Sequence, residues 1–334
     1  MKIHGLCIVK DEADVIAECL EASLAWCDHV YVFDNGSTDG TWQIVQALAA
    51  RHPAIVPFKQ DPAPFHDGLR AQIHDAYRQR TEPGDWWCRL DADEFYVDDP
   101  RTFLAKVPMD VDYVVTAIFA YYFTELDAAA WQADDQAFNA TPVTRRLRHY
   151  LNHWSEPRFM RADPARAWGP DQGGWPRWMH AGRAYPVRIW VKHYAYRSPP
   201  QIERRLATRR GAIDSGAAFA HEAVHDFPAA IASVTRTGNL PGRPAGPAAC
   251  VGWRQRVVPA SALHYDDQDR RLVVNEHLMP PIPGQPALGT ARLSHPWIAP
   301  LARAAARTRL RARALWKRVR AAEPPRPRPS GSTS

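Results

Sequence analysis

Acidic residues follow a short apolar run near residue 90. Residues Trp86 to Leu90 have the character of a buried strand. Asp91, Asp93 and Glu94 come directly after it. Because side chains two residues apart on an extended backbone point the same way, we expect Asp91 and Asp93 to present their carboxylates together and Glu94 to face elsewhere. Two converging carboxylates suit a hard divalent cation, although the same residues could form only an acidic turn.

The elements before these acids alternate between strand and helix. Expected strands cover residues 6–9, 29–33, 55–58 and 86–90, and expected helices cover residues 15–26, 41–50 and 68–80. Such alternation favours an α/β fold with a parallel sheet and helices on both faces. In open sheets of this kind, ligands bind beyond the carboxyl ends of the strands. Polar clusters occupy those ends at Lys10–Glu12, Asp34–Gly40 and Asp91–Glu94, so the sequence predicts a nucleotide-diphosphate site at this edge.

The rest of the chain is less regular. We expect strands at 113–123 and 188–196, a basic helix at 200–211, loops at 124–145, and short strands and loops at 146–183. Residues 236–300 hold many Pro and Gly and predict an irregular C-terminal appendage. Residues 301–322 predict a basic helix, and residues 323–334 a disordered tail.

Composition narrows the class of protein. The chain has 334 residues, of which 46% are apolar and 23% charged, as in ordinary globular proteins. The net charge is +6, but much of the excess lies in the last turns, which argues against nucleic acid as a partner. Five cysteines without a CxxC spacing indicate reduced, buried thiols in a cytoplasmic protein.

We find no secretory signal and no apolar run of roughly 20 residues that could span a bilayer. The basic stretch 301–320 carries Trp and Leu, so it could contact the anionic inner face of the membrane. The alternative is a solvated terminal helix packed loosely on the domain.

Three motifs together resemble glycosyltransferase family 2: Val9-Lys10-Asp11-Glu12, Val32-Phe33-Asp34-Asn35-Gly36-Ser37-Thr38-Asp39-Gly40-Thr41 and Arg89-Leu90-Asp91-Ala92-Asp93-Glu94-Phe95. The resemblance covers residues 3–125 well and residues 185–230 loosely. It implies a GT-A fold, which is a Rossmann-like domain with a mixed sheet, and a nucleotide-sugar donor. Residues 1–235 would form this domain, with 1–123 as its nucleotide-binding half and 124–235 as its acceptor half.

The resemblance also implies roles for single residues in donor binding. Glu12 would lie near the base of the nucleotide, and Asp34 would bind the base or ribose. Asp39 would help to fix that turn. Arg70 would lie near the diphosphate, and Asp91 would approach the ribose or the sugar. Asp34 and Asp39 could instead be simple turn formers, and Arg70 a surface residue of its helix.

The same resemblance implies a metal site. Asp93 would hold Mn²⁺ or Mg²⁺, and His193 in Lys192-His193-Tyr194 would complete the binding. A satisfied core histidine is the alternative for His193. Arg197-Ser198 and Arg204-Arg205 resemble the ending of one soluble bacterial subgroup. The cation would act as a Lewis acid on the leaving diphosphate.

The acceptor hydroxyl needs a general base, and here the sequence departs from the family pattern. Many members carry a Glu-Asp pair after the acceptor strand, and residues 125–200 hold none. Asp171 in a Gly-rich loop is our first candidate, beside Glu156 and, more weakly, His180. Family members are expected to invert the anomeric carbon. A processive QxxRW-like ending is absent, so we expect transfer of a single sugar.

Other functions remain open at this stage. A sugar nucleotidyltransferase usually has a Gly-rich loop with Lys after its first strand, whereas Lys10-Asp11-Glu12-Ala13 has no glycine. A non-catalytic scaffold for nucleotide-sugar or glycan is a second alternative. The donor could be a UDP-, GDP- or dTDP-sugar, and the acceptor a glycan or lipid-linked hydroxyl, as in polysaccharide biosynthesis. Sugar stacking and core filling are both open for the tryptophans Trp131, Trp154, Trp168, Trp175 and Trp178.

Overall fold

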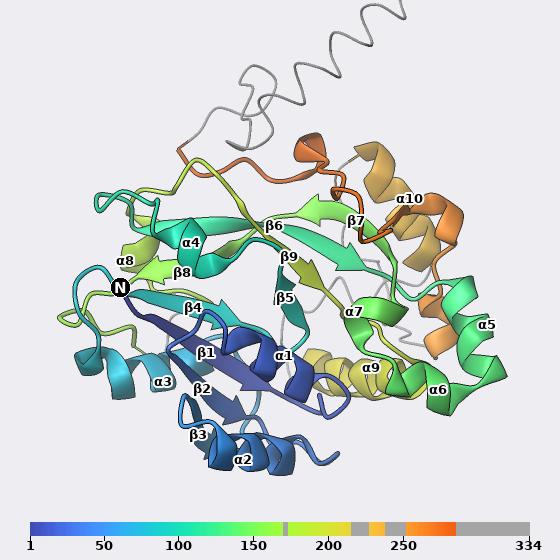
Figure 1. Cartoon of the computed structure of the whole chain (residues 1–334), viewed down its shortest axis with the longest axis horizontal. Helices are drawn as coiled ribbons and strands as arrows, with labels where there is room; N and C mark the ends of the chain where they lie inside the picture. Colours follow the sequence, from blue (N-terminus) through green and yellow to red (C-terminus); the bar gives the residue numbers. More distant parts are fainter. Residues whose placement is uncertain (170–172, 215–226, 238–251, 285–334) are drawn as a thin grey trace, which may run out of the picture. The chain divides into compact units, whose positions relative to one another are not determined.

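The computed structural model describes residues 1–169, 173–214, 227–237 and 252–284 (Figure 1). The chain divides into two compact units, residues 1–291 and 292–334, and everything described belongs to the first. Three predicted features lie outside the described residues: the candidate base Asp171, the basic helix at 301–322 and the tail at 323–334.

The first half of the chain forms four parallel strands in the order β3-β2-β1-β4. Their bounds are β1 (Ile3–Val9), β2 (His29–Asp34), β3 (Ile55–Gln60) and β4 (Trp86–Leu90). The register pairs Cys7 with both Val32 and Leu90. The carboxyl ends of β1, β2 and β4 therefore meet at one edge, as the alternating pattern predicted. The predicted helices on both faces are also confirmed.

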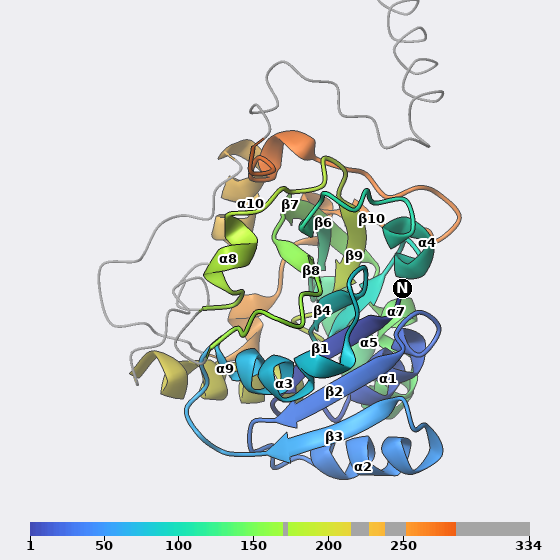
Figure 2. The same cartoon turned by 90° about the vertical axis from the view of Figure 1, so that its left-hand side faces the viewer.

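Those helices bury different sides of the parallel strands. Helices α1 (Ile16–Ser23) and α2 (Thr41–Arg51) pack on the face that carries Cys7 and Val9, whereas α3 (Leu69–Tyr77) covers the face that carries Leu6 and Trp87. Figure 2 shows α3 and α1 on either side of the strands.

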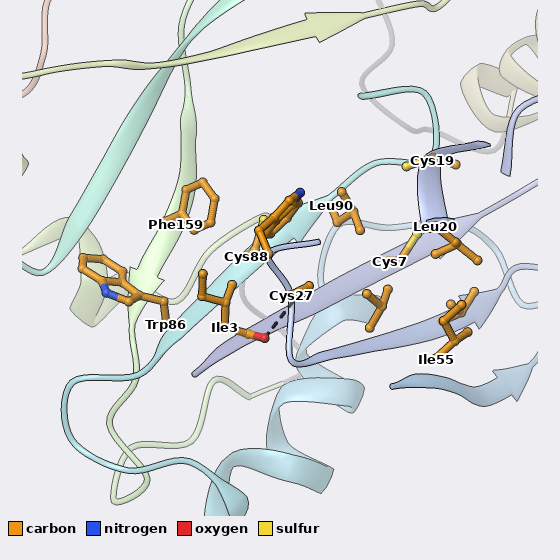
Figure 3. Packing of buried hydrophobic residues seen from close by; sticks show 14 of the residues in the cluster. Ile3, Cys7, Cys19, Leu20, Cys27, Ile55, Trp86, Cys88, Leu90 and Phe159 are labelled. Atoms are coloured by element: carbon orange, nitrogen blue, oxygen red, sulfur yellow. Dashed lines mark hydrogen bonds between the residues drawn. The ribbon is translucent and has the colours of Figure 1, made fainter. Parts of the chain in front are cut away.

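The core on the α1 side holds four free, buried cysteines: Cys7, Cys19, Cys27 and Cys88 (Figure 3). The Cys27 thiol donates to the carbonyl oxygen of Ile3 at 3.4 Å, which fixes the chain entering β2 beside the start of β1. Burial raises the pKa of each of these thiols well above its ordinary value, so they stay protonated and inert. The prediction of buried, reduced thiols is confirmed for these four.

The second half continues the sheet with strands of mixed direction. The bounds are β5 (Glu94–Tyr96), β6 (Tyr113–Tyr121), β7 (His149–Trp154), β8 (Pro157–Arg161), β9 (Ile189–His193) and β10 (His264–Tyr265). Strands β8 and β7 run antiparallel to successive parts of β6 and are separated by Ser155 and Glu156, with a register shift against β6 on either side of this stretch. Strand β9 lies parallel to β6 and antiparallel to β5, which sets Glu94 opposite His193.

The segment expected to be loops at 124–145 contains three helices, so that expectation was wrong. They are α5 (Glu125–Ala133), α6 (Asp135–Ala140) and α7 (Val143–Arg146). Thr124 and Asp127 form a capping box at the start of α5, and the Asp134 carboxylate caps α6. Such caps satisfy backbone N–H groups that short helices otherwise leave open. Only one residue in each helix is buried, so the apolar spacing that reveals longer helices is missing.

The remaining elements are four helices and four 3-10 turns of the described residues. They are α4 (Pro100–Leu104), α8 (Arg177–His180), α9 (Pro199–Asp214), α10 (Phe227–Thr237) and the 3-10 turns η1 (Arg78–Arg80), η3 (Trp253–Arg256), η4 (Ala260–Ala262) and η5 (Glu276–Leu278). Helix α9 corresponds to the predicted basic helix at 200–211. Within the described part of the chain, no helix is long and apolar enough to cross a membrane.

Residues 252–284 are irregular, as expected, but they pack on the mixed half of the sheet. Strand β10 pairs with β7, and the Val258 amide donates to the Phe123 carbonyl at 3.0 Å. Asp266 is buried in this segment, and its carboxylate accepts from Lys192 Nζ and from the Tyr121 hydroxyl, each at 2.5 Å. A buried carboxylate thus ties this segment to β9 and β6.

Candidate functional site

The backbone turns at the acidic motif and separates its two aspartates. The Glu94 amide donates to the Asp91 carbonyl at 3.2 Å, which closes a turn over these residues. Asp91 and Glu94 consequently share one partner, Arg158, while Asp93 faces His193. The expectation that Asp91 and Asp93 converge and Glu94 faces elsewhere was therefore wrong, because it assumed an extended backbone through residue 94.

Asp91 is held between two buried arginines. Its Oδ1 lies 2.5 Å from Arg70 Nη2, and its Oδ2 lies 3.0 Å from Arg158 Nη2. Burial alone would raise the pKa of Asp91, but Arg158, Arg70 and Arg89 hold it far below its usual range. Asp91 is thus a fixed anion with both oxygens engaged, and Arg70 on α3 is buried against it instead of lying on the surface.

Arg158 on β8 organises three carboxylates. Its guanidinium bonds Glu94 at 2.9 and 2.5 Å and pairs with Glu156 Oε1 at 2.9 Å, besides its contact with Asp91. Glu156 directly precedes β8, and the pairing of β8 with β4 brings it beside the end of β4. Burial alone would raise the pKa of Glu156, but Arg158 and Arg89 hold it below its ordinary value, so it is ionised.

Asp93 is buried and meets one histidine and two arginines. Its Oδ2 lies 3.3 Å from His193 Nε2, 3.7 Å from Arg197 Nη1 and 3.9 Å from Arg205 Nη1. Burial alone would lower the pKa of His193, but Asp93 holds it above its ordinary value. Burial alone would raise the pKa of Asp93, but His193 and the arginines hold it below its usual range. The pairing of β5 with β9 is what brings Asp93 and His193 together.

Arg197 connects this pair to the loop after β1. Its side chain is completely buried, donates to Asp14 twice at 2.8 Å, and bonds the Glu12 carboxylate. Its Nη1 also donates to the Tyr194 carbonyl at 2.9 Å. Burial raises the pKa of Glu12 to about 7, although Arg197 opposes the shift. The loops after β1, β4 and β9 thus converge on one guanidinium.

The loop after β2 joins the same edge through hydrogen bonds to the loop after β1. The amides of Asp11 and Glu12 donate to Ser37 Oγ and Thr41 Oγ1 at 2.9 and 2.8 Å. Asp39 accepts from the Thr41 hydroxyl at 2.6 Å through one oxygen and from the Ala13 amide at 3.1 Å through the other. One oxygen of Asp39 thus fixes its own loop at the start of α2, and the other ties that loop to the loop after β1.

Asp34, at the end of β2, keeps one oxygen unused. Its side chain is fully buried, and Oδ1 accepts from the Ser37 amide at 2.7 Å and from Gln60 Nε2 at 3.3 Å. Its Oδ2 has no hydrogen-bond partner within the described part of the chain. A buried acceptor without a partner is costly, which marks this oxygen as a candidate acceptor for a donor group of a ligand.

The comparison of the sequence with family models agrees with this geometry. The model described as "Glycosyl transferase family 2" matches residues 7–157. This stretch is a glycosyltransferase family 2 domain. It contains all three motifs that suggested the resemblance and the loops after β1, β2 and β4. No curated protein matches the sequence.

Solved glycosyltransferase structures are similar to the chain at low identity. The mannosyltransferase PcManGT from Pyrobaculum calidifontis, in complex with GDP-Man and Mn²⁺, shares 17% identity over 72% of this chain and 66% of its own, with a TM-score of 0.36. S. aureus TarS 1-349 shares 14% identity over 64% of this chain and 65% of its own, with a TM-score of 0.34. The chain thus spans just under two thirds of the length of these structures.

Asp93 and His193 could hold a divalent cation. Their facing oxygen and nitrogen atoms can supply two ligands, and the structure shows no group of three or more His, Cys, Asp or Glu within the described residues that could hold a metal alone. Mg²⁺ and similar cations commonly take one or two protein ligands and fill the other positions with substrate phosphates and water. The two residues fit a cation that arrives with a diphosphate.

The three candidates for the base lie in different places. Glu156 belongs to the cluster around Asp91, and Asp171 lies outside the described residues. Gly174 comes shortly after Asp171 in the sequence and lies against Arg89. A Cβ added at Gly174 would come within 2.9 Å of Arg89 Nη1. His180 is exposed, and its ring packs on that of Tyr113. Tyr113 and Trp87 both pair with Met160, so His180 lies near the start of β4, at the opposite end of the strands from the other candidate residues.

Sequence reasoning missed most of the arginines that surround the candidate site. Arg158 and Arg89 order the carboxylates around Asp91, and Arg197 and Asp14 bridge the loops. Arg197 was visible only as part of a subgroup-like ending, and Arg158 had no local signal at all. A buried arginine in a strand looks like any other polar residue until its distant carboxylates are known.

Proposed function

We propose that the protein is a metal-dependent glycosyltransferase that moves a single sugar from a nucleotide-diphosphate sugar to a hydroxyl of a glycan or lipid-linked acceptor, with inversion. The observation that carries this proposal is the meeting of Asp93, His193 and Arg197 where the loops after β1, β2 and β4 join. Cationic and anionic side chains alternate there at the edge where open α/β sheets bind nucleotides.

The donor nucleotide would lie over the loops after β1 and β2. The free Oδ2 of Asp34 suits an N–H of the base or a ribose hydroxyl, because both donate hydrogen bonds. Asp39 keeps that loop in place without touching the donor. Glu12 is bound to Arg197, so its role is to orient that guanidinium beside the nucleotide.

The diphosphate would lie beside Asp93, His193 and the arginines near them. A bound cation, held by Asp93 and His193, would supply Lewis-acid stabilisation of the charge on the leaving diphosphate. Arg197 and Arg205 stand within 4 Å of Asp93 and add positive charge at the same place. Charge-assisted hydrogen bonds from guanidinium to phosphate are among the strongest in proteins. UDP-, GDP- and dTDP-sugars all offer this diphosphate.

Two carboxylates are candidates for the general base. Glu156 is ionised, partly exposed and fixed by Arg158 at 2.9 Å beside Asp91. Asp171 follows Gly169, whose amide is bonded to Asp75 Oδ2 at 3.0 Å, and precedes Gly174 beside Arg89. Comparing Glu156→Gln with Asp171→Asn in acceptor transfer decides between them, because removal of a base lowers transfer typically by about 100-fold or more.

A sugar nucleotidyltransferase fits the loop after β1 less well. Lys10 is the cation of that loop, and its Nζ donates to the Gly36 carbonyl at 2.5 Å. It therefore ties the two loops together, whereas a nucleotidyltransferase would direct such a lysine at a triphosphate.

The test of the proposed function is hydrolysis of UDP-, GDP- and dTDP-sugars in the presence of Mn²⁺ or Mg²⁺, measured as release of the nucleoside diphosphate. We expect one donor class to be hydrolysed only with metal, and Asp93→Ala to abolish the release. Asp135→Ala, in an exposed turn of α6, is the matched control and should behave as wild type. If no donor is hydrolysed although a nucleotide binds, the chain is a scaffold and the proposal of catalysis fails.

A further inference from the structure

Four of the five tryptophans between residues 131 and 178 have structural partners. Trp168 and Trp175 are buried and stacked, with ring centroids 5.4 Å apart and planes 9° from parallel. Trp131 packs edge-on against the ring of Trp253. These rings fill the core or its margin.

The fourth, Trp178, donates its indole N–H to the Ala167 carbonyl at 3.1 Å, and Arg166 lies over its ring. Trp154 differs from the other four, because 47% of it is exposed to solvent. An exposed indole at the end of a strand leaves a broad apolar surface in water, which a ligand can cover.

Strand register places Trp154 on the same face of the sheet as His193. Trp154 lies opposite Ile118, and Ile118 lies opposite Val191. His193 lies opposite Ala120 on the same pair of strands. Because directly opposite residues share a face and residues two apart do too, all five side chains project from one face. Figure 1 shows β9, β6 and β7 side by side.

The separation suits an acceptor. Trp154 and His193 stand on strands two apart, and neighbouring strands are about 4.8 Å apart, so the lateral offset is roughly 10 Å. A donor sugar attached to the diphosphate near His193 would fill part of that interval. Glu156 follows Trp154 by two residues and shares the partner Arg158 with Asp91. Register shifts against β6 flank this stretch, and β-bulges commonly re-aim side chains beside active sites.

We propose that Trp154 is the stacking platform of an acceptor subsite, on which the apolar face of a sugar ring of a glycan acceptor lies. The inference rests on the proposed transferase function and adds the class of acceptor to it. An indole offers a broad, rigid apolar surface, and a sugar ring offers a face of C–H groups with hydroxyls at its rim. The hydroxyl that receives the new sugar would then point toward Glu156 and the donor.

The experiment measures transfer to a panel of methyl glycosides and disaccharides, using the donor that the wild-type protein hydrolyses. We expect Trp154→Ala to raise the acceptor KM by roughly tenfold or more, as truncation of a central aromatic contact does. Trp154→Phe keeps a flat ring and should restore most of the affinity. Tyr265→Ala is the matched control, because Tyr265 is 58% exposed on β10 and should leave the acceptor KM as in wild type.

A second readout separates this inference from the proposed function. The protein labelled with 5-fluorotryptophan gives a Trp154 resonance that Trp154→Phe identifies, and we expect disaccharides of the panel to shift it even without donor. An unchanged acceptor KM in Trp154→Ala, or a resonance that no disaccharide moves, overturns the role of Trp154. Donor hydrolysis by wild type decides the proposed function separately.

Discussion

The two aspartates of the acidic motif differ in what surrounds each carboxylate. Asp91 has both oxygens engaged by Arg70 and Arg158, whereas Asp93 faces His193 across 3.3 Å. The same residue type thus serves as an anchor for arginines at one position and as a prospective metal ligand two positions later. Composition and spacing predicted the pair, but only the turn between them assigns the two roles.

Arg158 is the side chain on which the carboxylate cluster depends most. We expect Arg158→Met to lower the free energy of unfolding by about 3–5 kcal/mol, because it leaves Glu94 and Asp91 charged and unpaired in a buried place. Urea denaturation measures this loss. Arg166→Met, at an exposed arginine, is the control. A loss below about 1 kcal/mol for Arg158→Met would show that the cluster is not an energetic unit.

His4 on β1 predicts a dependence of stability on pH. Burial lowers the pKa of His4 to about 4, and its ring lies 5.0 Å from that of Trp87. The unfolded chain, with an ordinary histidine pKa near 6.5, binds a proton first as pH falls. The stability that the neutral, buried His4 contributes is therefore complete above about pH 6.5 and is lost as the pH drops toward 4.

We expect the unfolding free energy of wild type to fall between pH 7 and pH 4.5 by about 2 kcal/mol more than that of His4→Gln. His277→Gln, at an exposed histidine, is the control and should follow wild type. Urea denaturation at the two pH values measures both. Equal pH dependence in wild type and His4→Gln would contradict a neutral, buried His4.

Among the elements, β5 and β9 decide where the site forms. The four parallel strands could be predicted because each has a local apolar run followed by a helical period. Strand β5 has only three residues, Glu94–Tyr96, and pairs with a strand almost a hundred residues later. No local pattern predicts such a pairing, so the sequence suggested His193 only through resemblance. The helices at 125–146 were missed for a related reason, because caps rather than an apolar stripe define them.

The segment 252–284 supports β9 through Asp266. We expect Asp266→Asn to destabilise the fold by about 3 kcal/mol, because Lys192 loses its buried anionic partner. Cleavage within residues 252–284 by a protease should become faster, which limited proteolysis followed by mass spectrometry measures. Asp269→Asn, at an exposed position of the same segment, should cleave as wild type does. Equal cleavage of both variants would mean that the segment is held by other contacts.

At the scale of the whole molecule, the site joins two halves of the fold. The sequence predicted the elements of the first half better than those of the second. The edge formed by the loops after β1, β2 and β4 follows from a regular α/β pattern, and its outline was correct from sequence: parallel strands, helices on both faces and polar loops at one edge. The other half depends on register shifts on either side of residues 154–157, a crossover to β9 and arginines whose partners are distant in sequence. Its Trp154 became distinct from four other tryptophans only through exposure and register.

The central claim is that Asp93 and His193 hold a cation together with the diphosphate of a nucleotide-sugar. Its most direct test is the melting temperature of wild type and Asp93→Asn with UDP, GDP and dTDP, each with and without Mn²⁺, since a ligand that binds only the folded state raises that temperature. We predict that one nucleotide raises the melting temperature of wild type only when Mn²⁺ is present and that Asp93→Asn loses this response. Stabilisation by no nucleotide, or an equal shift without metal and in Asp93→Asn, would contradict the claim.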